Sequence, residues 1–419
     1  MPKAAPQPVD DTPSKPLHDP GAKPDSGPTP RTRPGPLKLF LLAGEPSGDA
    51  LGGALIAGLR SLAPDLRLAG VGGPAMQAQG LTSLFPMEEL SVMGLAEVLP
   101  RYPALRRRLH QAADAMLADP PDALVTIDSP DFSLRLAARV RAARPDLRTI
   151  HYVAPSVWAW RPGRAARMAH HIDHVLALLP FEPPYMQAAG MTCDFVGHPI
   201  AARPAASPAE IAAFRAAHDL GDAPVILVLP GSRGGEVARM APVFAATLAR
   251  VLVKRPDVRL VLPTVPAVAA QVRAAPWPAP PVIVEAGTVP EAQTRAAFAA
   301  GRVALAASGT VSLDLAAAGV PMVIAWDAHP ITRLLMSRML RIDTVTLVNL
   351  VSETRAVPEF LGPACRPDRL APALLDLMQD GPARDAQTAA MAETLLCLGR
   401  GDAAPGLRAA RSVLAEIPR

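Results

Sequence analysis

The stretch LKLFLLAGEPSGDALGGALIAGLR, residues 37–60, passes from an apolar run through a glycine-containing turn into an amphipathic pattern. This succession is typical of the strand, turn and helix that begin a nucleotide-binding α/β domain. The turn, however, carries Glu45 and Asp49, and two carboxylates would repel a phosphate. The stretch therefore predicts a layered α/β fold and leaves the ligand of its first turn open.

The composition allows two domains of ordinary size. The chain has 419 residues, 50% of them hydrophobic, and a formal net charge of +4. Its basic residues are almost all arginine, whose planar guanidinium suits phosphate and diphosphate groups. No dense basic stripe with interleaved aromatic residues occurs in the sequence, so nucleic-acid binding gains little support.

The cysteines and the apolar runs bear on compartment. Cys193, Cys365 and Cys397 lie far apart, without the spacing of metal ligands. No apolar run of the sequence has the length of a transmembrane helix, and residues 1–36 lack the hydrophobic segment of a secretory signal. We therefore expect a reducing, cytoplasmic location, either soluble or peripheral on a membrane.

The first 36 residues differ from the rest of the chain. Eleven prolines stand here among Asp, Lys, Gly and Ser, and such a composition offers too few apolar groups to offset the entropy of ordering. We predict a disordered, proline-rich tail over residues 1–36, with a functional tether as the alternative.

From Leu37 onward, short apolar runs alternate with helical spacing, which predicts two tandem, doubly wound α/β domains with mostly parallel sheets. The first series of expected strands covers residues 37–43, 67–71, 123–127, 148–153, 174–179 and 194–196. The second series covers residues 225–229, 258–262, 281–285, 303–307, 321–325 and 345–348. The predicted divisions are an N-terminal domain (37–203), a C-terminal domain (204–380), and C-terminal helices (381–419) that we expect to pack back on the N-terminal domain.

A connector rich in proline and alanine, GHPIAARPAASPAE (197–210), separates the two series. In it, Ser207, Pro208 and Glu210 have the spacing of a helix cap, a first helical residue and a capping-box carboxylate. We therefore predict a helix that starts here and a domain boundary near residue 203.

The turn after the first strand of the second domain is suited to a phosphate. The run VILVLPGSRGGEV (225–237) places Gly231, Ser232 and Arg233 directly after an apolar strand. Glycine allows a ligand to approach the backbone, and arginine donates two parallel hydrogen bonds to a phosphate. Taken alone, this pattern is equally compatible with a plain turn and a solvated arginine.

A second turn of the same domain favours the nucleotide. Ser308, Gly309 and Thr310 follow a strand and precede a short helix, where amides and hydroxyls bind anions. Asp314, one turn into that helix, is placed to accept hydrogen bonds from a ribose diol. A capped helix without ligand is the alternative, but two such turns in one domain favour a nucleotide diphosphate. Neither turn contains GxxxxGK[ST] or GxGxxG, so ATP hydrolysis and NAD chemistry lose support to a nucleotide-sugar.

In the first domain, the run ALVTIDSPDF (123–132) ends an apolar strand on Asp128, with Asp131 three residues later. A carboxylate at the carboxyl end of a strand is placed to act as a general base toward an attacking hydroxyl. Capping of the next helix is the alternative, and it fits Asp131 better than Asp128.

Two further stretches carry aromatic and imidazole side chains. IHYVAPSVWAWR (150–161) contains Trp158 and Trp160, which form either a wall for a sugar or acyl group or part of the core. DFVGHPI (194–200) places His198 at the domain junction, where we expect a hinge residue near the cleft rather than a base.

The segment LSVMGLAEVLPRYPALRRRLHQ (90–111) combines apolar and basic residues. Peripheral contact with an anionic membrane requires this combination, although a buried helix with a solvated basic face is equally compatible. The residues of this predicted membrane patch are Leu95, Val98, Leu99, Tyr102, Leu105, Arg106 and Arg107.

With the nucleotide expected in the second domain, the first turn is left for another ligand. Carboxylates and small residues at the top of a strand suit sugar hydroxyls. We therefore interpret Glu45, Ser47, Gly48 and Asp49 as sugar-facing, with Ser47 also capping the helix.

Taken together, these stretches resemble the lipid-A-disaccharide synthase family. The resemblance runs from about residue 37 to the C-terminus. Its motifs are GEPSGD (44–49), MEELSVMGLAEVL (87–99), TIDSPDF (126–132), IHYVAPSVWAWR (150–161), FVGHP (195–199), LPGSRGGEV (229–237), SGT (308–310) and VPEFLG (357–362).

The resemblance implies a glycosyltransferase of the type B fold, with two Rossmann-like domains facing a cleft and no metal or other cofactor. It implies an inverting transfer from UDP-2,3-diacylglucosamine to 2,3-diacylglucosamine 1-phosphate, which yields UDP and the β(1→6) lipid A disaccharide 1-phosphate. It further implies peripheral attachment to the cytoplasmic face of the inner membrane of a Gram-negative bacterium, and leaves a homodimer open.

The resemblance also suggests roles for individual residues. Asp128 corresponds to the essential acidic residue, which we take as the base for the acceptor's 6-hydroxyl. Arg233 and the SGT turn would hold the diphosphate, with Asn349 and Glu359 near the donor sugar. Asp314 stands where a glutamate is expected. Similarly, Gly362 stands where a glutamine is expected, and AWDAHP (325–330) replaces a more basic stretch.

Two rival functions remain at this point. A UDP-sugar 2-epimerase of the same fold also needs a UDP site in the second domain, but has no need of the apolar and basic segment. A two-lobed periplasmic sugar-binding protein would carry a signal peptide, which residues 1–36 do not resemble.

Overall fold

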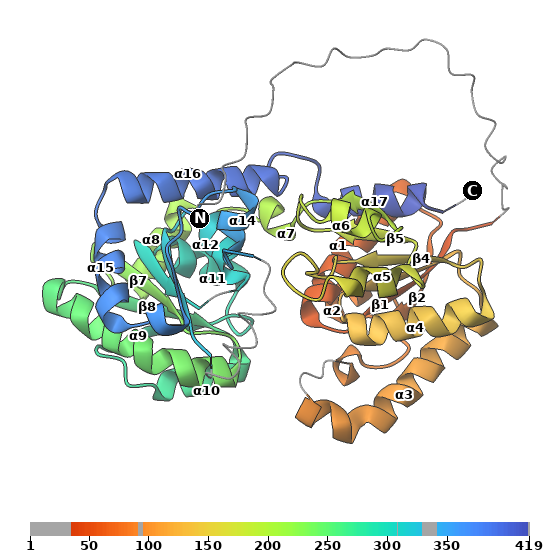
Figure 1. Cartoon of the computed structure of the whole chain (residues 1–419), viewed down its shortest axis with the longest axis horizontal. Coiled ribbons are helices and arrows are strands. Elements are labelled where there is room, and N and C mark those ends of the chain that lie inside the picture. Colours follow the sequence, from red (N-terminus) through yellow and green to blue (C-terminus); the bar gives the residue numbers. More distant parts are fainter. Residues whose placement is uncertain (1–34, 91–94, 308, 329–341, 418–419) are drawn as a thin grey trace, which may run out of the picture. The chain divides into compact units, whose positions relative to one another are not determined.

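The computed structural model describes residues 35–90, 95–307, 309–328 and 342–417, with the backbone alone for 95–99. Strands and helices alternate along the chain and form two separate parallel sheets (Figure 1). The change of sheet falls between Phe195, where the last strand of the first sheet ends, and Val225, where the second sheet begins. The predicted α/β class with two doubly wound units is thereby confirmed.

The first sheet has the strand order β2-β1-β3-β4-β5-β6, and all its described pairings are parallel. Its strands are β1 (Lys38–Ala43), β2 (Arg67–Val71), β3 (Ala123–Ile127), β4 (Arg148–Tyr152), β5 (His174–Ala177) and β6 (Thr192–Phe195). The helices of this part are α1 (Pro46–Leu62), α2 (Pro74–Ala78), α3 (Leu95–Ala118), α4 (Pro130–Ala143), α5 (Gly163–Ala169), α6 (Pro183–Gln187) and α7 (Pro199–Ala202).

The second sheet has the order β12-β11-β10-β7-β8-β9 and is again parallel in its described pairings. Its strands are β7 (Val225–Leu229), β8 (Arg259–Thr264), β9 (Val282–Glu285), β10 (Val303–Ala306), β11 (Met322–Trp326) and β12 (Glu359–Leu361). The helices of this part are α8 (Pro208–Ala217), α9 (Gly234–Lys254), α10 (Pro266–Ala274), α11 (Glu291–Ala299), α12 (Val311–Ala317), α14 (Leu347–Val351), α15 (Pro367–Met378) and α16 (Pro382–Cys397). The last helix, α17 (Pro405–Ala415), packs on the first sheet.

Helices cover both faces of the second sheet, as the side chains of β7 demonstrate. Val225, Leu227 and Leu229 belong to one buried apolar cluster, whereas Ile226 and Val228 belong to another. Successive residues of a strand point to opposite faces, so a strand buried on both faces is apolar throughout. The continuous apolar runs in the sequence have this origin.

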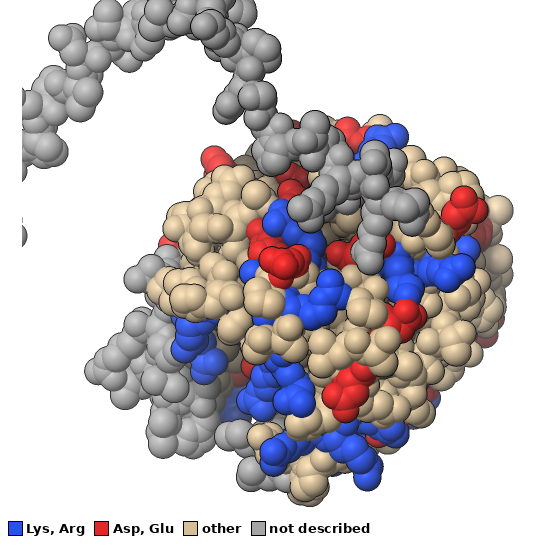
Figure 2. Space-filling view, turned by 90° about the vertical axis from the view of Figure 1, so that its right-hand side faces the viewer, with Lys and Arg blue, Asp and Glu red and all other residues tan. Residues whose placement is uncertain are grey.

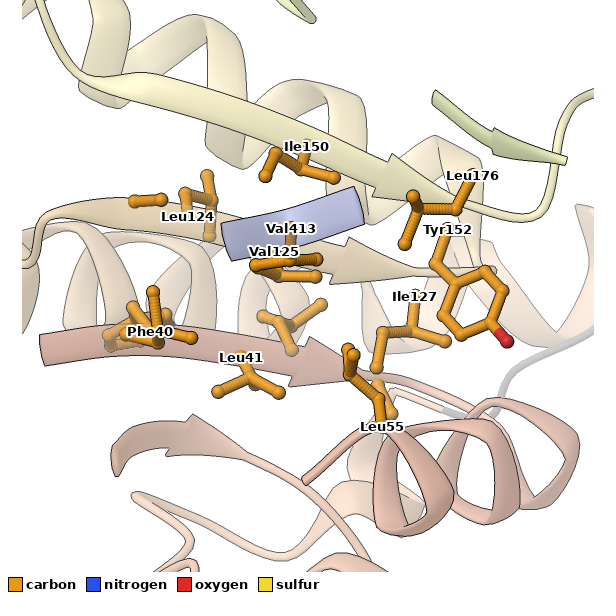
Figure 3. Close-up of a cluster of buried hydrophobic side chains, with 14 of the residues drawn as sticks. Phe40, Leu41, Leu55, Leu124, Val125, Ile127, Ile150, Tyr152, Leu176 and Val413 are labelled. Atoms are coloured by element: carbon orange, nitrogen blue, oxygen red, sulfur yellow. The ribbon is translucent and has the colours of Figure 1, made fainter. Parts of the chain in front are cut away.

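The core of the first sheet is built from the same kind of strand. Side chains of β1, β3, β4 and β5 meet helices α1 and α17 in one cluster of buried residues (Figure 3). Tyr152 is the largest of the fully buried side chains, and burial raises the pKa of its hydroxyl to well above the ordinary value. Val413 contributes from α17, so the end of the chain is part of this core.

The contact between α1 and α17 depends on glycine. A Cβ added to Gly58 would lie 2.6 Å from the carbonyl oxygen of Gly406, and one added to Gly406 would lie 2.5 Å from that of Ala54. Real Cβ atoms do not approach a carbonyl oxygen so closely, so the two helix backbones pack directly on one another.

A buried histidine further ties α17 to the first sheet. His174 Nε2 lies 2.8 Å from Ser412 Oγ, and that hydroxyl donates to Asp194 Oδ2 at 2.6 Å. Burial lowers the pKa of His174 to about 4, so the imidazole is neutral at pH 7. Arg148 and Glu416 form an ion pair at the same contact.

Eleven of the twelve predicted strands coincide with strands β1 to β11, with ends that differ by up to two residues. The prediction of a strand over 345–348 was wrong, because α14 begins at Leu347 and the last strand of the sheet is β12. A short apolar run does not distinguish a strand from a buried helix. The predicted helix start is confirmed, since Ser207 and Glu210 form a capping box at α8.

The predicted tail over residues 1–36 lies almost wholly outside the described residues. Within the described part of the chain, no helix combines the length and apolar character needed to cross a bilayer.

Gly406→Ala tests the packing of α17. The added methyl group must push the two backbones apart, and we expect the free energy of unfolding to fall by about 1–3 kcal/mol. Urea unfolding followed by circular dichroism measures this change. Gly163→Ala is the matched control, because no atom lies within 4 Å of its added Cβ. Equal stability of the two variants would contradict the direct backbone contact.

Candidate functional site

The strand orders place two switch points, where connections leave toward opposite faces of a sheet. In the first sheet this point lies between β1 and β3, and in the second between β7 and β10. Ligands of doubly wound sheets bind beyond the carboxyl ends of the strands at such points. The four turns concerned are those that begin at Gly44, Asp128, Pro230 and Ala307. All four carry motifs that the sequence singled out.

A cavity of about 880 Å³ opens at the switch point of the second sheet, within the roughly 300–1,000 Å³ range of ligand pockets. It brings together six residues that the sequence assigned to the nucleotide: Gly231, Ser232, Arg233, Gly309, Thr310 and Asp314. Ser308 lies outside the described residues.

The turn after β7 already holds a carboxylate. Glu236 Oε2 accepts a hydrogen bond from the amide of Ser232 at 3.1 Å, and a Cβ on Gly231 would lie 2.3 Å from the same oxygen. Gly231 has φ of 127°, which favours glycine. Arg233 is exposed at the N-cap of α9. The Ser232 amide therefore donates to an anionic group, and in this structure that group is the carboxylate of Glu236.

Asp314 lines the cavity beside an arginine from the connector. Arg203 Nη1 donates to Asp314 Oδ1 at 2.5 Å. Burial raises the pKa of Asp314, and the positive charge of Arg203 partly offsets this effect. In the sequence, Arg203 was singled out only as a domain limit, and its side chain was not predicted to line this cavity.

Asn349 and Glu359 have other partners than a donor sugar. The Asn349 side chain donates to the carbonyl of Val357 and accepts from its amide, both at 2.9 Å. The Glu359 carboxylate accepts from the amides of Val345 and Thr346. Neither residue lines the cavity. Asn349 thus holds the loop between α14 and β12, and Glu359 holds the segment that precedes α14, while their contact with the donor sugar stays a prediction.

Asp128 stands at the switch point of the first sheet with an unusual backbone. Its φ is 53°, and Ser129 follows with φ of 43°. On the adjacent strand end, Val153 has φ of 86°, which is rare for a β-branched residue. Backbone strain of this kind concentrates at functional sites, where the surrounding structure maintains it. Here the amide of Asp128 donates to the carbonyl of Tyr152 at 3.0 Å.

The side chain of Asp128 is half-buried and accepts a long hydrogen bond from Ser47 Oγ at 3.4 Å. Glu45 lies nearby, and burial, followed by the negative charge of Asp128, raises the pKa of its carboxyl. The two turns therefore bring two carboxylates together. The expected capping role of Ser47 was wrong, since Glu45 is the N-cap residue of α1 and no side chain caps this end.

Gly48 and Asp49 were expected to face a sugar, and both are buried. A Cβ on Gly48 would lie 3.2 Å from the carbonyl oxygen of Ile127, so this glycine allows α1 to pack on β3. The Asp49 carboxylate accepts hydrogen bonds from the amides of Gly73, Ala75 and Met76 at 2.8–3.0 Å. Its task is to hold the turn and the first residues of α2, which does not fit the expected sugar contact.

Trp158 is held by a buried acid that the sequence analysis missed. Its Nε1 donates to Glu182 Oε1 at 3.3 Å, and its ring meets Phe181 edge to face at 5.1 Å. Burial raises the pKa of Glu182 to about 7. The other carboxylate oxygen accepts from the amides of Leu178 and Leu179. Trp158 is thus half-buried and fixed in orientation, and it combines core packing with an accessible part.

His198 caps the N-terminus of α7 at the start of the connector. Its Nδ1 accepts from the amide of Ile200 at 3.1 Å, and its own amide donates to the carbonyl of Leu398 at 3.0 Å. Burial lowers the pKa of His198 to about 4. The neutral ring keeps the lone pair that the helix cap requires.

The predicted membrane patch lies on α3. Leu95, Val98 and Leu99 belong to the stretch whose side chains are not described. Tyr102, Arg106 and Arg107 are exposed, whereas Leu105 packs against the core. Arg108 instead pairs with Glu89 and stacks over the ring of Phe85. Figure 2 shows basic side chains gathered in the lower part of the face it presents, with acidic side chains between them.

Further residues that line the cavity were not predicted from the sequence, among them Thr264, Ala286 and Arg295. Thr264 is the last residue of β8. A hydroxyl at the carboxyl end of a strand was the available signal for Thr264, by the same rule that identified Asp128. The connector and α11 gave no such signal. In the described residues, no cluster of His, Cys, Asp or Glu has the arrangement of a metal site.

Solved structures resemble this chain over almost its whole length. A glycosyltransferase of kitacinnamycin aligns with a TM-score of 0.56 at 19% identity, over 92% of this chain and 100% of that one. A UDP-GlcNAc 2-epimerase of Methanocaldococcus jannaschii, solved with UDP-GlcNAc and UDP, aligns with a TM-score of 0.56 at 12% identity, over 90% and 99% of the two chains. At these identities the likeness shows the type B glycosyltransferase fold and no particular reaction.

Comparison by sequence is more specific. The family model described as lipid-A-disaccharide synthetase matches residues 39–401. A lipid-A-disaccharide synthase of Ruegeria pomeroyi is 61% identical over 388 residues, which cover 91% of this chain and 96% of that protein. The chain therefore belongs to the lipid-A-disaccharide synthase family and is a glycosyltransferase of lipid A biosynthesis.

Proposed function

We propose that the protein transfers 2,3-diacylglucosamine from its UDP derivative to 2,3-diacylglucosamine 1-phosphate. The acceptor's 6-hydroxyl loses its proton to the enzyme, and its oxygen forms a bond to C1 of the donor sugar. The bond between C1 and the diphosphate breaks on the opposite face, so the configuration inverts. The products are UDP and the β(1→6) disaccharide 1-phosphate.

The cavity at the switch point between β7 and β10 is the observation that carries the donor half of this proposal. Arg233 and the turn at 309–310 lie on neighbouring strand ends that border it, and both suit a diphosphate. As UDP departs it gains negative charge, which a guanidinium and helix amides stabilise. Arg233 is therefore assigned both to binding and to leaving-group stabilisation.

Asp128 is assigned as the base. The strained turn directs a half-buried carboxylate beyond the end of β3, where an acceptor hydroxyl is within its reach. Glu45 lies beside it, and burial, followed by the negative charge of Asp128, raises the pKa of the Glu45 carboxyl. Ser47 Oγ, at 3.4 Å, orients the Asp128 carboxylate.

The acceptor carries two acyl chains, so the enzyme has to meet its substrate at a lipid surface. The exposed Tyr102, Arg106 and Arg107 on α3 supply an aromatic and basic contact for anionic headgroups. We assign this patch to peripheral binding at the cytoplasmic face of the inner membrane. The accessible part of Trp158 is assigned to the acceptor sugar.

The direct test of the reaction combines purified protein with both acylated sugars in detergent. We expect one free UDP for each disaccharide 1-phosphate formed. A UDP-sugar 2-epimerase on the same fold would instead bind a non-acylated UDP-sugar tightly and give no disaccharide. That result would replace the proposed reaction by epimerisation.

Asp128→Asn tests the base. The amide cannot take the proton, so we expect kcat to fall by about 10²–10⁴-fold while the affinity for UDP stays close to that of the wild type. Steady-state kinetics and UDP titration calorimetry measure the two quantities. Glu45→Gln is the matched control and should lose much less activity. A larger loss in Glu45→Gln than in Asp128→Asn would transfer the role of base to Glu45.

Arg106→Glu together with Arg107→Glu tests the membrane patch. Each basic residue near an anionic surface contributes about 1 kcal/mol, so reversal of two charges should weaken vesicle binding at least thirtyfold, by about 2 kcal/mol. Sedimentation with vesicles that contain anionic lipid measures the effect. Arg239→Glu with Arg250→Glu makes the same charge change at exposed positions of α9 and should affect binding less. Equal losses in the two double variants would indicate a non-specific charge effect.

A further inference from the structure

A buried hydroxyl without a partner borders the nucleotide cavity. Thr264 is 6% exposed, and its Oγ1 has no hydrogen-bond partner in the described part of the chain. Buried hydroxyl groups are almost always hydrogen-bonded, since removal from water without compensation destabilises the fold. Because Thr264 lines the cavity, its missing partner is expected among the groups of a ligand that fills it.

Other buried polar atoms without partners give a weaker signal. Arg295 Nε is also unpaired and also belongs to a cavity residue. The guanidinium of Arg295, however, is ion-paired with Glu210 and Glu291, so its charge is already satisfied. The Thr264 hydroxyl has no comparable partner in the described part of the chain.

The strand order decides which part of a nucleotide reaches Thr264. The two turns that suit the diphosphate follow β7 and β10, which are neighbours in the sheet. Strand β8 lies next to β7, on the side away from β10. Thr264, as the last residue of β8, is therefore displaced from the diphosphate along the edge of the sheet. Ala286 of the turn after β9 donates to the carbonyl of Thr264 at 2.8 Å, so the two turns form one end of the cavity.

The surroundings of this end suit a flat, partly polar ring. Val265, Val289 and Phe298 line the cavity and offer apolar contact to the faces of a ring. The Thr264 hydroxyl both donates and accepts hydrogen bonds, so it matches either a carbonyl or a ring N–H at the edge of a pyrimidine. A diphosphate, by contrast, requires donors alone and is better served by Arg233.

We propose that Thr264 Oγ1 hydrogen-bonds to the base of the uridine nucleotide and contributes to the affinity for the donor. This assignment rests on the proposed UDP-sugar donor. Thr264 is a binding residue in this scheme and takes no part in proton transfer, so its loss should raise KM for the donor and leave kcat unchanged.

Thr264→Val removes the hydroxyl and keeps the shape of the side chain. We expect it to bind UDP about tenfold more weakly than the wild type in titration calorimetry, which corresponds to about 1.4 kcal/mol. Thr264→Ser keeps the hydroxyl and should bind UDP within about threefold of the wild type. UDP affinity that is equal in Thr264→Val and the wild type would overturn the inference.

The stability of the free protein separates a binding role from a structural one. Because the hydroxyl has no partner in the free state, Thr264→Val should unfold at the same temperature as the wild type or a higher one. The stabilisation that saturating UDP provides should shrink in the same variant. A lower unfolding temperature without ligand, together with unchanged stabilisation by UDP, would make Thr264 a structural residue and contradict the proposal.

Pyrophosphate locates the contact within the nucleotide. Its affinity should be the same for Thr264→Val and the wild type, because it contains no base. A tenfold loss for pyrophosphate would assign the hydroxyl to the phosphates and overturn the base contact. If the folded wild-type protein does not bind UDP, the donor proposal and this inference both fail. If the wild type binds UDP and Thr264→Val binds it equally well, this inference fails and the donor proposal stands.

Discussion

Parallel pairing of the strands is the constraint on which the candidate sites depend. In each sheet the described strands run in one direction, so their carboxyl ends all lie at the same edge. Residues far apart in the sequence, such as Glu45 and Asp128, are thereby brought together. The same constraint brings Arg233 and Thr310 to one cavity of the second sheet.

Two kinds of interaction hold the residues at the strand ends in place. Close helix packing is the first, since Gly48 lets α1 approach the carbonyl of Ile127 and Gly58 lets α17 lie directly on α1. Backbone hydrogen bonds to neighbouring strands are the second, and they hold Asp128 and Val153 at positive φ. Strain of this kind costs of order 1–3 kcal/mol per residue, which the packed core around β3 and β4 has to offset.

The sequence predicted the strands well because most of them are buried on both faces. Strands such as β7 and β10 are continuous apolar runs, and their limits follow from turn residues. The order of strands within each sheet is not written in any local pattern, so the switch points were not predictable. The strand expected at 345–348 failed for a related reason: only tertiary packing decides whether a short apolar run such as TLVNLV becomes a strand or a helix.

The candidate site was predictable at the level of turns and less so at the level of side chains. Gly231, Arg233 and Asp314 lie where their turns implied, because the end of a strand determines the position of the residues that follow it. Arg203 was missed because an arginine in a connector carries no motif. Thr264 was missed because a threonine at the carboxyl end of a strand is too common a signal to single it out. Their significance comes from tertiary neighbours: Asp314 for the first, and the cavity for the second.

The hydrogen-bond partners of a carboxylate cannot be read from the sequence, as three acidic residues illustrate. Asp49, Glu359 and Asp128 all stand beside turns near strand ends, and all three were candidates for contact with substrate. Asp49 accepts three backbone amides and Glu359 accepts two, so their lone pairs are used within the fold. Within the described part of the chain, the Asp128 carboxylate accepts only a long hydrogen bond from Ser47, and its side chain is half-buried. A carboxylate that is occupied by amides stabilises a turn, whereas one with spare acceptor capacity at a switch point is free to receive a proton, and this difference in hydrogen bonding favours Asp128 as the base.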